Sequence, residues 1–229
     1  MKKLVIIPAF NEEGNLEKTI QDISDHAPGF DYVIINDCST DDTLDICRRH
    51  GYSYLNLPVN LGIGGAVQTG YRYAYYHGYD IAVQFDGDGQ HSAGYLDKLV
   101  GHMQETDSDM VIGSRFIEKE GFQSSGIRRV GICYFTALIK LLTGARITDP
   151  TSGMRMVNRR ILKKFTEDYP KDYPEPESVV TVLSEGYKVT EVPVVMHERE
   201  EGVSSISLAN GIYYMIKVSI AIVIARMKR

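Results

Sequence analysis

The sequence predicts an α/β fold in which a doubly wound, mostly parallel, Rossmann-like sheet is followed by an irregular C-terminal portion. Short β-branched runs alternate with longer amphipathic patterns through the first half of the chain, which is typical of parallel sheets. A polar or glycine-rich cluster follows each of these runs. Because ligands of such sheets gather at the carboxyl ends of the strands, the clusters predict one site along one edge.

Each element has its own pattern in the sequence. Strands are expected where apolar and β-branched residues run together, at residues 4–7, 32–35, 52–57, 81–85 and 110–112. Helices are expected between them, at about residues 16–26, 43–50, 66–76 and 96–105. The second half predicts an amphipathic helix, a proline-rich ordered loop over the site, a further helix and a strand, at residues 127–142, 169–176, 178–185 and 188–196.

Composition excludes several classes of protein. With 229 residues, of which 43% are hydrophobic, the chain can bury an ordinary core without disulfides or a structural metal. The formal charge of −5 argues against a protein that wraps nucleic acid. The three cysteines are well separated and form no C-x-x-C pair, so they support neither a disulfide framework nor a zinc ribbon, and a reducing cytosol is expected.

Neither end of the chain is expected to cross a membrane. The N-terminal run imitates a secretory signal, but Pro8 and the polar residues behind it favour a buried first strand. Residues 212–225 are strongly apolar, yet the run is interrupted by Lys217 and is shorter than the roughly 20 residues of a spanning helix. Residues 1–205 are expected to form the main domain, and residues 206–229 an apolar and basic tail that fits a membrane interface.

Asp86 and Asp88 form the strongest chemical motif. They follow the strand expected at residues 81–85, and the two-residue period of extended chain puts both carboxylates on the same side. Two hard oxygen ligands suit Mg²⁺ or Mn²⁺, and the amide oxygen of Gln90 is within reach of the same cation. His91 stands where an EF-hand loop needs glycine, which argues against an EF-hand. His91 itself is expected to be a hydrogen-bonding neighbour of the site and not a ligand. A solvated Asp-Gly turn stays an alternative.

Two further clusters fit a nucleotide. Gly62, Gly64 and Gly65 precede a helix whose free N–H groups would hold phosphate or sugar oxygens. Neither the dinucleotide fingerprint nor the Walker A pattern fits these glycines, so a plain tight turn is equally expected. Asp37 stands at a strand end, where a carboxylate accepts hydrogen bonds from a base or ribose, while residues 39–42 are explained as helix caps.

The order of these motifs resembles that of the family 2 glycosyltransferases of GT-A fold, specifically the dolichyl- or polyprenyl-phosphate sugar synthase branch. The resemblance covers roughly residues 3–205 and rests on six segments in register, at residues 7–13, 36–41, 60–62, 84–91, 113–115 and 149–155. The family's common second segment reads D-D-G-S, whereas Asn36 and Cys38 stand here in place of its first Asp and its Gly. Asp37 itself is in place.

The resemblance implies a nucleotide-sugar donor, UDP- or GDP-linked, and a role for each segment. By similarity, Asp86, Asp88 and Gln90 bind Mg²⁺ or Mn²⁺ at the donor diphosphate. Arg115 and Arg199 are expected to stabilise the negative charge that builds on the leaving group. The nucleotide is expected to contact the remaining segments, through Pro8, Phe10, Asn11, Glu12, Asp37, Gly62, Gly65 and Gln90.

The acceptor decides what Asp149 does. A sugar hydroxyl needs a general base, whereas a lipid phosphate, with a second pKa of about 6, is already largely dianionic, so that Asp149 then serves as a positioning group. The apolar helix at residues 127–142, with basic residues at its ends, fits an interface with anionic lipid, and an ordinary core helix is the alternative. The cations expected near the lipid phosphate are Arg128, Arg129 and Arg155.

The sequence therefore predicts an inverting, metal-dependent glycosyltransferase that acts on polyprenyl phosphate at the cytosolic face of a membrane. A homo-oligomer or a membrane-protein partner stays open. One alternative is a family 2 enzyme that extends a cell-wall or capsular glycan. Two others are a nucleotidyltransferase, against which the acidic segment at residues 11–13 speaks, and a non-catalytic binding module, against which the Asp86/Asp88 pair speaks.

Overall fold

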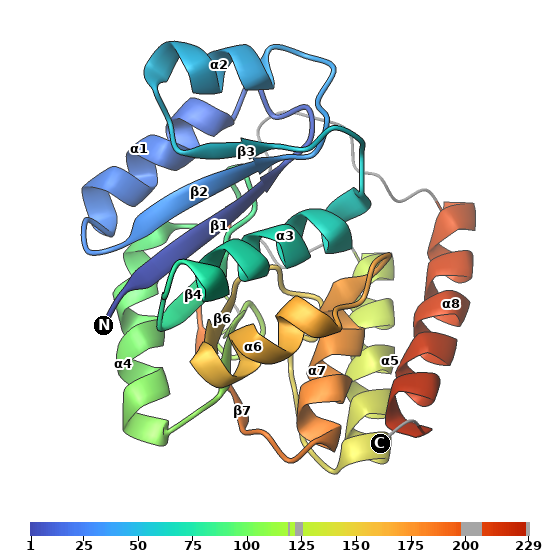
Figure 1. The fold of residues 1–229 in the computed structure, drawn as a ribbon. Coiled ribbons are helices and arrows are strands. Elements are labelled where there is room, and N and C mark those ends of the chain that lie inside the picture. Colours follow the sequence, from blue (N-terminus) through green and yellow to red (C-terminus); the bar gives the residue numbers. More distant parts are fainter. Residues whose placement is uncertain (119, 122–125, 198–207, 228–229) are drawn as a thin grey trace.

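The computed structural model describes residues 1–118, 120–121, 126–197 and 208–227. Within this part of the chain, seven strands form one sheet in the order β3-β2-β1-β4-β6-β5-β7 (Figure 1). Neighbouring strands are parallel except where β6 pairs with β4 and β5. The predicted α/β fold with a mostly parallel sheet is confirmed.

The elements alternate along the first half as predicted. The strands are β1 Lys3–Ala9, β2 Asp31–Asn36, β3 Tyr54–Asn56, β4 Ile81–Gln84, β5 Met110–Ser114, β6 Arg155–Asn158 and β7 Val189–Pro193. The α-helices are α1 Leu16–His26, α2 Thr43–His50, α3 Gly62–Tyr76, α4 Leu96–Thr106, α5 Gly126–Thr143, α6 Arg159–Glu167, α7 Pro174–Ser184 and α8 Leu208–Met227. A short 3-10 turn, Ala93–Tyr95, precedes α4.

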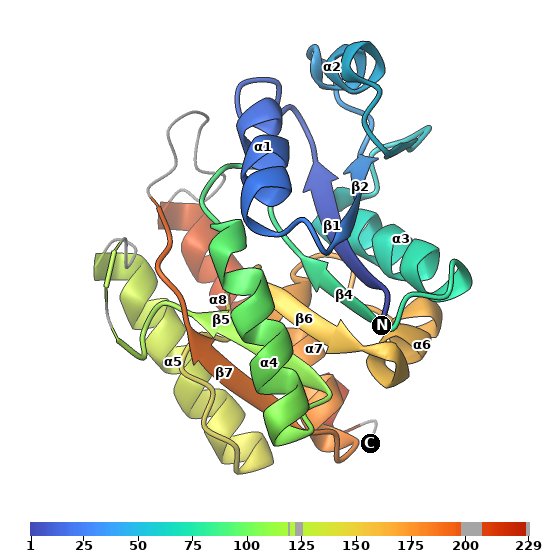
Figure 2. The same cartoon turned by 90° about the vertical axis from the view of Figure 1, so that its left-hand side faces the viewer.

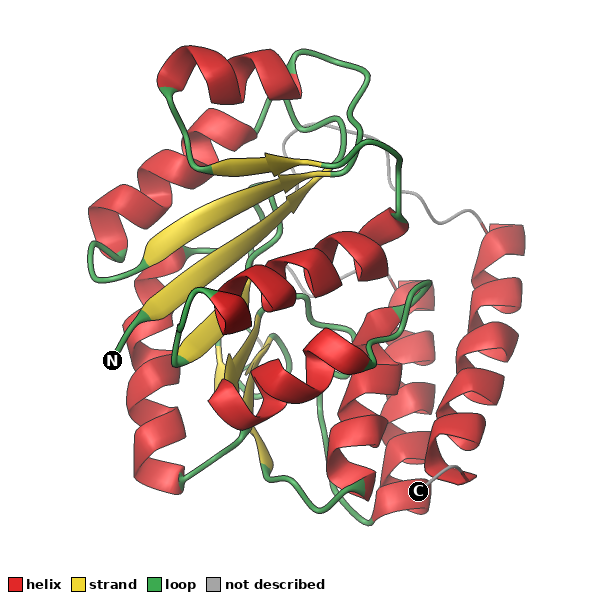
Figure 3. Cartoon of the chain, viewed as in Figure 1, coloured by secondary structure: helices red, strands yellow, loops and turns green. Residues whose placement is uncertain are grey.

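Helices cover both faces of the sheet (Figures 1 and 2). α1, α2 and α4 pack on one face, and α3 with α5 to α8 on the other; Figure 3 separates the yellow sheet from these red helices. Along β1, Leu4 and Ile6 join the core on the α3 side, whereas Val5 and Ile7 join the core on the α1 side. All four are fully buried, as expected of a central strand covered on both faces.

Several boundaries differ from the prediction. β6 and α6 were not predicted, and β6 lies antiparallel between β4 and β5. α3 begins at Gly62 rather than at residue 66, and α7 begins at Pro174, inside the stretch expected as a loop, because proline suits the first turn of a helix. The last strand ends at Pro193, earlier than expected.

The strand order reverses beside β1, with β2 and β3 on one side and β4 on the other. Ligands of doubly wound sheets bind at such a switch point, outside the carboxyl ends of the strands. β1, β2 and β4 end there and lead into residues 10–13, 37–42 and 85–91, which are three of the polar clusters found in the sequence.

α8 packs against α5 and α7 and contributes Val218, Ile222 and Ala225 to the core on that side (Figure 1). The domain boundary predicted at residue 205 lies outside the described residues. Among the helices that are described, none has the length and hydropathy needed to cross a membrane.

Candidate active site

Asp86 and Asp88 lie on the loop that leaves β4. The backbone N–H of Asp86 donates to Nδ1 of His91 at 3.1 Å, and Nε2 of the same ring lies 3.8 Å from Asp86 Oδ2. His91 is buried and packs edge-on against Phe85. The ring therefore orients the loop, and its predicted role as a hydrogen-bonding neighbour is confirmed.

Two groups that the sequence analysis missed fix the side chain of Asp86. The buried amide of Gln84 donates to Asp86 Oδ1 at 3.0 Å. A Cβ added to Gly153 would lie 2.1 Å from Asp86 Oδ2, so only glycine lets the 149–153 segment lie against this carboxylate. The glycine within the segment at residues 149–155 was the available signal for this contact.

The donor set of this loop fits a hard divalent cation. Asp86 and Asp88 are both partly exposed and offer only carboxylate oxygens, which Mg²⁺ and Mn²⁺ prefer. Across the described ranges no group of three or more His, Cys, Asp or Glu side chains is placed so that it could hold a metal ion. Mg²⁺ sites in proteins commonly combine one or two carboxylates with water and substrate phosphates. The side-chain amide of Gln90 donates to the His197 carbonyl at 3.4 Å, and its role at a cation stays a prediction.

The segment after β1 docks on the loop after β2. Asn11 Oδ1 accepts the backbone N–H of Thr40 at 2.8 Å. The backbone N–H of Glu12 donates to the hydroxyl of Thr43, the first residue of α2, at 2.9 Å. Asn11 has φ 57°, a left-handed conformation that asparagine tolerates. Pro8 is buried at the end of β1, whereas Phe10 is exposed beside it. Asn11 and Glu12 therefore shape this edge, and Phe10 is exposed next to them in the chain.

Asp37 ties the end of β2 to the start of α3. It is buried, its Oδ1 accepts the backbone N–H of Leu61 at 2.7 Å, and its carbonyl accepts the side chain of Asn60 at 3.1 Å. No described residue bonds to its second carboxylate oxygen. Asp37 thus has a structural task that the sequence did not predict, and its contact with a nucleotide stays a prediction.

The glycine-rich loop serves packing. The N–H of Gly62 donates to Asn60 Oδ1 at 3.0 Å, and the N–H of Gly64 donates to the Lys171 carbonyl at 3.1 Å. A Cβ on Gly64 would lie 2.2 Å from that carbonyl oxygen. The N–H groups of Gly62 and Gly64 are therefore engaged within the chain itself. A nucleotide contact by Gly62 or Gly65 stays a prediction.

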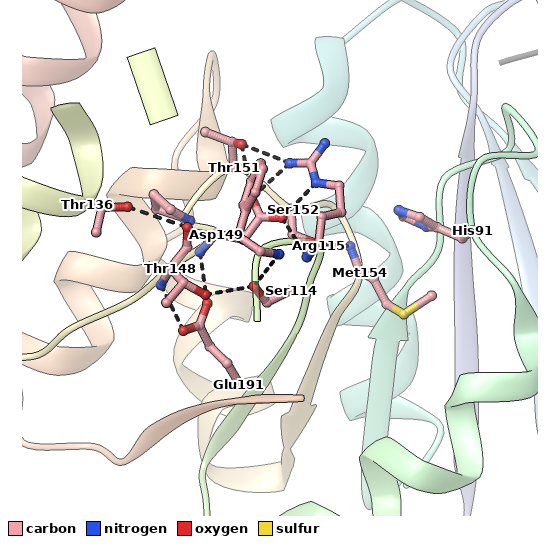
Figure 4. Close-up of polar contacts among 12 residues, drawn as sticks. His91, Ser114, Arg115, Thr136, Thr148, Asp149, Thr151, Ser152, Met154 and Glu191 are labelled. Atoms are coloured by element: carbon pink, nitrogen blue, oxygen red, sulfur yellow. Dashed lines mark hydrogen bonds and ion pairs between the residues drawn. The ribbon is translucent and has the colours of Figure 1, made fainter. Parts of the chain in front are cut away.

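Asp149 and Arg115 form a buried, bidentate ion pair (Figure 4). Arg115 Nε lies 2.7 Å from Asp149 Oδ2, and Nη2 lies 2.7 Å from Oδ1. The backbone N–H of Arg115 also donates to Oδ2, and the Thr151 hydroxyl donates to Oδ1. Asp149 is 0% exposed, so both of its oxygens are engaged inside the protein. The carboxylate of Asp149 is therefore hydrogen-bonded to Arg115 and Thr151, and its role toward an acceptor stays a prediction.

Of the other predicted cations, Arg155 is not available to an acceptor. Arg155 is 1% exposed, and its guanidinium is hydrogen-bonded to groups inside the protein. The prediction that it lies near a lipid phosphate was therefore wrong. Arg199 and the side chain of Arg128 lie outside the described residues, while Arg129 is exposed on α5. Arg155 donates to three carbonyls and one hydroxyl, those of Pro150, Ser152, Glu175 and Ser178.

Glu191 on β7 was also missed. It accepts the backbone N–H groups of Thr148 and Asp149, and its burial raises the pKa of its carboxyl. The signal in the sequence was a lone acidic residue within the apolar run at residues 188–196.

Comparison with known proteins assigns this sequence to a family. The family model described as "Glycosyl transferase family 2" matches residues 4–166. The chain belongs to glycosyl transferase family 2. It is therefore a glycosyltransferase, and the resemblance found in the sequence is confirmed.

Two curated relatives agree with this assignment, and a solved structure shares the fold. The undecaprenyl-phosphate mannosyltransferase of Micrococcus luteus is 29% identical over 216 residues, covering 90% of this chain and 88% of the relative. The UDP-N-acetylglucosamine–dolichyl-phosphate N-acetylglucosaminyltransferase of Methanococcus voltae is 29% identical over 211 residues, 83% of each chain. Glucosyl-3-phosphoglycerate synthase of Mycobacterium tuberculosis, at 21% identity, has a TM-score of 0.74 over 98% of this chain and 78% of its own. The last comparison confirms the GT-A fold.

Proposed function

We propose that this glycosyltransferase moves a sugar from a UDP- or GDP-sugar to a polyprenyl phosphate by one in-line displacement that inverts the anomeric carbon. The engaged state of Asp149 carries the proposal. A hydroxyl acceptor requires a base to remove its proton, whereas a phosphate monoester with a second pKa of about 6 is already largely ionised. The names of the relatives, which include a polyprenol monophosphomannose synthase of Mycolicibacterium smegmatis, support the same acceptor class.

The residues around the switch point divide the work. Asp37 and the segment after β1 contact the nucleotide. Asp86 and Asp88 hold Mg²⁺ or Mn²⁺, which supplies electrostatic stabilisation of the leaving diphosphate when bound; solved neighbours with UDP and Mn²⁺ or Mg²⁺ support this choice. Arg115 keeps Nη1 without a partner among the described residues, so a phosphate oxygen can accept from it.

The helices on the C-terminal side offer a surface for a lipid acceptor. α8 buries one side against α5 and α7, yet its outward side is apolar too. Exposed apolar side chains at helical spacing are unfavourable in water and suit a bilayer interface, while Arg129 and Arg226 add positive charge for anionic headgroups. The enzyme is therefore peripheral on a membrane, and its docking face consists of Val130, Leu141, Ile216, Ile220, Ile224 and Met227.

The acceptor is tested by mass spectrometry of the products. The enzyme is incubated with a panel of nucleotide sugars and with polyprenyl phosphate, the matching polyprenol, or a cell-wall glycan. We expect product only with the phosphate, and NMR of that product should give the anomeric configuration opposite to that of the donor. Glycan extension without any product on polyprenyl phosphate would contradict the proposal and favour the glycan-acceptor alternative.

The docking face is tested by flotation with vesicles that contain anionic lipid. Ile220→Asp should lower vesicle binding several-fold without changing the melting temperature, because Ile220 is exposed on α8. Tyr76→Asp is the matched control, since Tyr76 is also exposed and apolar but lies on α3. Unchanged flotation of the Ile220 variant, with a change in oligomeric state, would assign the face to a second copy of the chain.

A further inference from the structure

Glu191 clamps the turn from which Asp149 projects. It lies on β7, paired with Ile112 of β5, and is half-buried. Its Oε2 accepts the backbone N–H of Thr148 at 2.7 Å, and its Oε1 accepts that of Asp149 at 2.9 Å (Figure 4). One carboxylate thus satisfies two consecutive backbone donors, and each of its oxygens accepts one of them.

A second contact ties the same turn to β5. The hydroxyls of Ser114 and Thr148 lie 2.7 Å apart, and Ser114 immediately precedes Arg115. The turn is therefore held at its backbone by β7 and at its side chain by β5. Asp149 leaves this fixed turn and meets the Arg115 guanidinium through both oxygens. The position of Arg115 consequently depends on how firmly the turn is held.

We propose that ionised Glu191 is a positioning residue, which holds the 148–149 turn so that Asp149 presents Arg115 to the phosphates of the reaction. The inference rests on the proposed function in one respect, because it takes Arg115 as a phosphate-binding group. Glu191 acts only through its neighbours. A glutamine at this position would face one of the two backbone N–H groups with its own NH₂ and would lose that hydrogen bond.

The electrostatics of Glu191 separate this role from a contribution to stability. Burial raises the pKa of the carboxyl, repulsion by Asp149 adds to the rise, and the N–H donors of the turn oppose it. A raised pKa means that the folded state favours the protonated acid, so Glu191 contributes most to stability at acid pH, and this contribution is lost as pH rises through the raised pKa. The clamp behaves oppositely, because it needs the carboxylate and is lost as pH falls through the same pKa.

Other charged residues on the elements around Glu191 bond to partners other than Glu191. At the two ends of β7, Lys98 of α4 bonds to the Pro193 carbonyl, and the Lys188 N–H bonds to Asp109. Near the end of α7, Glu185 pairs with Lys164 at 2.6 Å. The charges that face the carboxyl itself are those of Asp149 and, behind it, Arg115.

The first test is hydrogen exchange of Glu191→Gln, with Thr190→Val as the matched control. Thr190 is the adjacent residue of β7 and points to the other side of the sheet, where its hydroxyl donates to Ser108 at 2.9 Å. We expect the amides of Thr148 and Asp149 to exchange about tenfold faster or more in the glutamine variant, and at the wild-type rate in the valine variant. Wild-type exchange at both amides of the glutamine variant would overturn the clamp.

The second test is a double-mutant cycle on kcat/KM for transfer. Glu191→Gln should lower kcat/KM roughly tenfold when Arg115 is present, and less than twofold when Arg115→Met has already removed the guanidinium. Equal losses in both backgrounds would overturn positioning through Arg115. If Arg115→Met alone keeps full transfer, the proposed function of Arg115 fails, while the exchange result still decides whether Glu191 clamps the turn.

If Glu191→Gln does not fold, the proposal is tested on the wild-type protein. Amide exchange, corrected for its intrinsic pH dependence, is followed as pH falls through the acid range. We expect Thr148 and Asp149 to lose protection while the amide of Val111 on β5 keeps it. Parallel behaviour of all three amides would overturn the proposal.

Discussion

Replacing Asp149 by asparagine should destabilise the fold and disable transfer together. The substitution keeps the volume of the side chain but leaves the Arg115 guanidinium, whose side chain is 12% exposed, without its charge partner. Breaking a buried ion pair by removing one partner costs about 3–5 kcal/mol, and the remaining bond to the Thr151 hydroxyl puts the expected loss at the lower end, about 3 kcal/mol. For a domain of this size that is a fall in Tm of about 6–12 °C.

The assay combines urea unfolding with transfer kinetics at a temperature where both proteins are folded. Asp45→Asn is the matched control, because Asp45 pairs with Arg48 at 3.0 Å on the surface and should lose less than about 0.5 kcal/mol. Transfer by the Asp149 variant should fall about 100-fold, as when one electrostatic donor is lost from a transition state.

Arg115→Met and Asp149→Asn should lower kcat/KM by similar factors, and the double variant by no more than either alone, because the two side chains act as one unit. An Asp149→Asn protein with wild-type stability would refute the buried pair. Losses in kcat/KM that multiply in the double variant would assign Asp149 a role of its own, such as that of a general base.

Three further predictions concern the cation, the nucleotide and the backbone at Cys38. Asp88→Asn should abolish transfer and Asp86→Asn should impair it severely, whereas full activity of either variant in excess chelator would contradict the cation site. Asp37→Ala should raise the donor Kd measured by calorimetry. It should also lower the free energy of unfolding by about 1–2 kcal/mol, because the Leu61 N–H loses its acceptor. Asp37→Asn keeps an oxygen for that N–H and should be the more stable of the two variants. Cys38 has φ 60°, a left-handed conformation that strains a non-glycine residue, at the position where the family's common segment carries glycine. Cys38→Gly should therefore leave the unfolding free energy unchanged or raise it by up to about 1 kcal/mol, and a clear loss of unfolding free energy would contradict backbone strain at Cys38.

The sequence predicted the elements whose signal is local. β1, β2 and β4 each contain an unbroken apolar run, and the polar residues that follow these runs mark the switch point in the sequence itself. The buried face of α8 was not predictable in the same way, because apolar residues are spread around most of the helix and do not say which side meets α5 and α7.

The parts that were missed depend on contacts between distant segments. Arg155 was predicted to be a cation for a lipid phosphate because it is among the arginines nearest in sequence to the helix expected at residues 127–142. In the structure, carbonyls from Pro150, Ser152 and Glu175 accept hydrogen bonds from its guanidinium instead. β6 begins at this arginine, so a strand was interpreted as the end of a polar motif. Glu191 likewise accepts hydrogen bonds from a turn more than 40 residues away, which the sequence around it does not indicate.

The nucleotide released during transfer tests the central claim most directly. The enzyme is given a labelled nucleotide sugar and polyprenyl phosphate in vesicles, and the nucleotide and the glycolipid are quantified together. Attack of the lipid phosphate on the anomeric carbon predicts one nucleoside diphosphate for each sugar-phosphate lipid, with no product from polyprenol or in the Asp88→Asn variant. Release of nucleoside monophosphate would mean transfer of a sugar phosphate instead and would contradict the account.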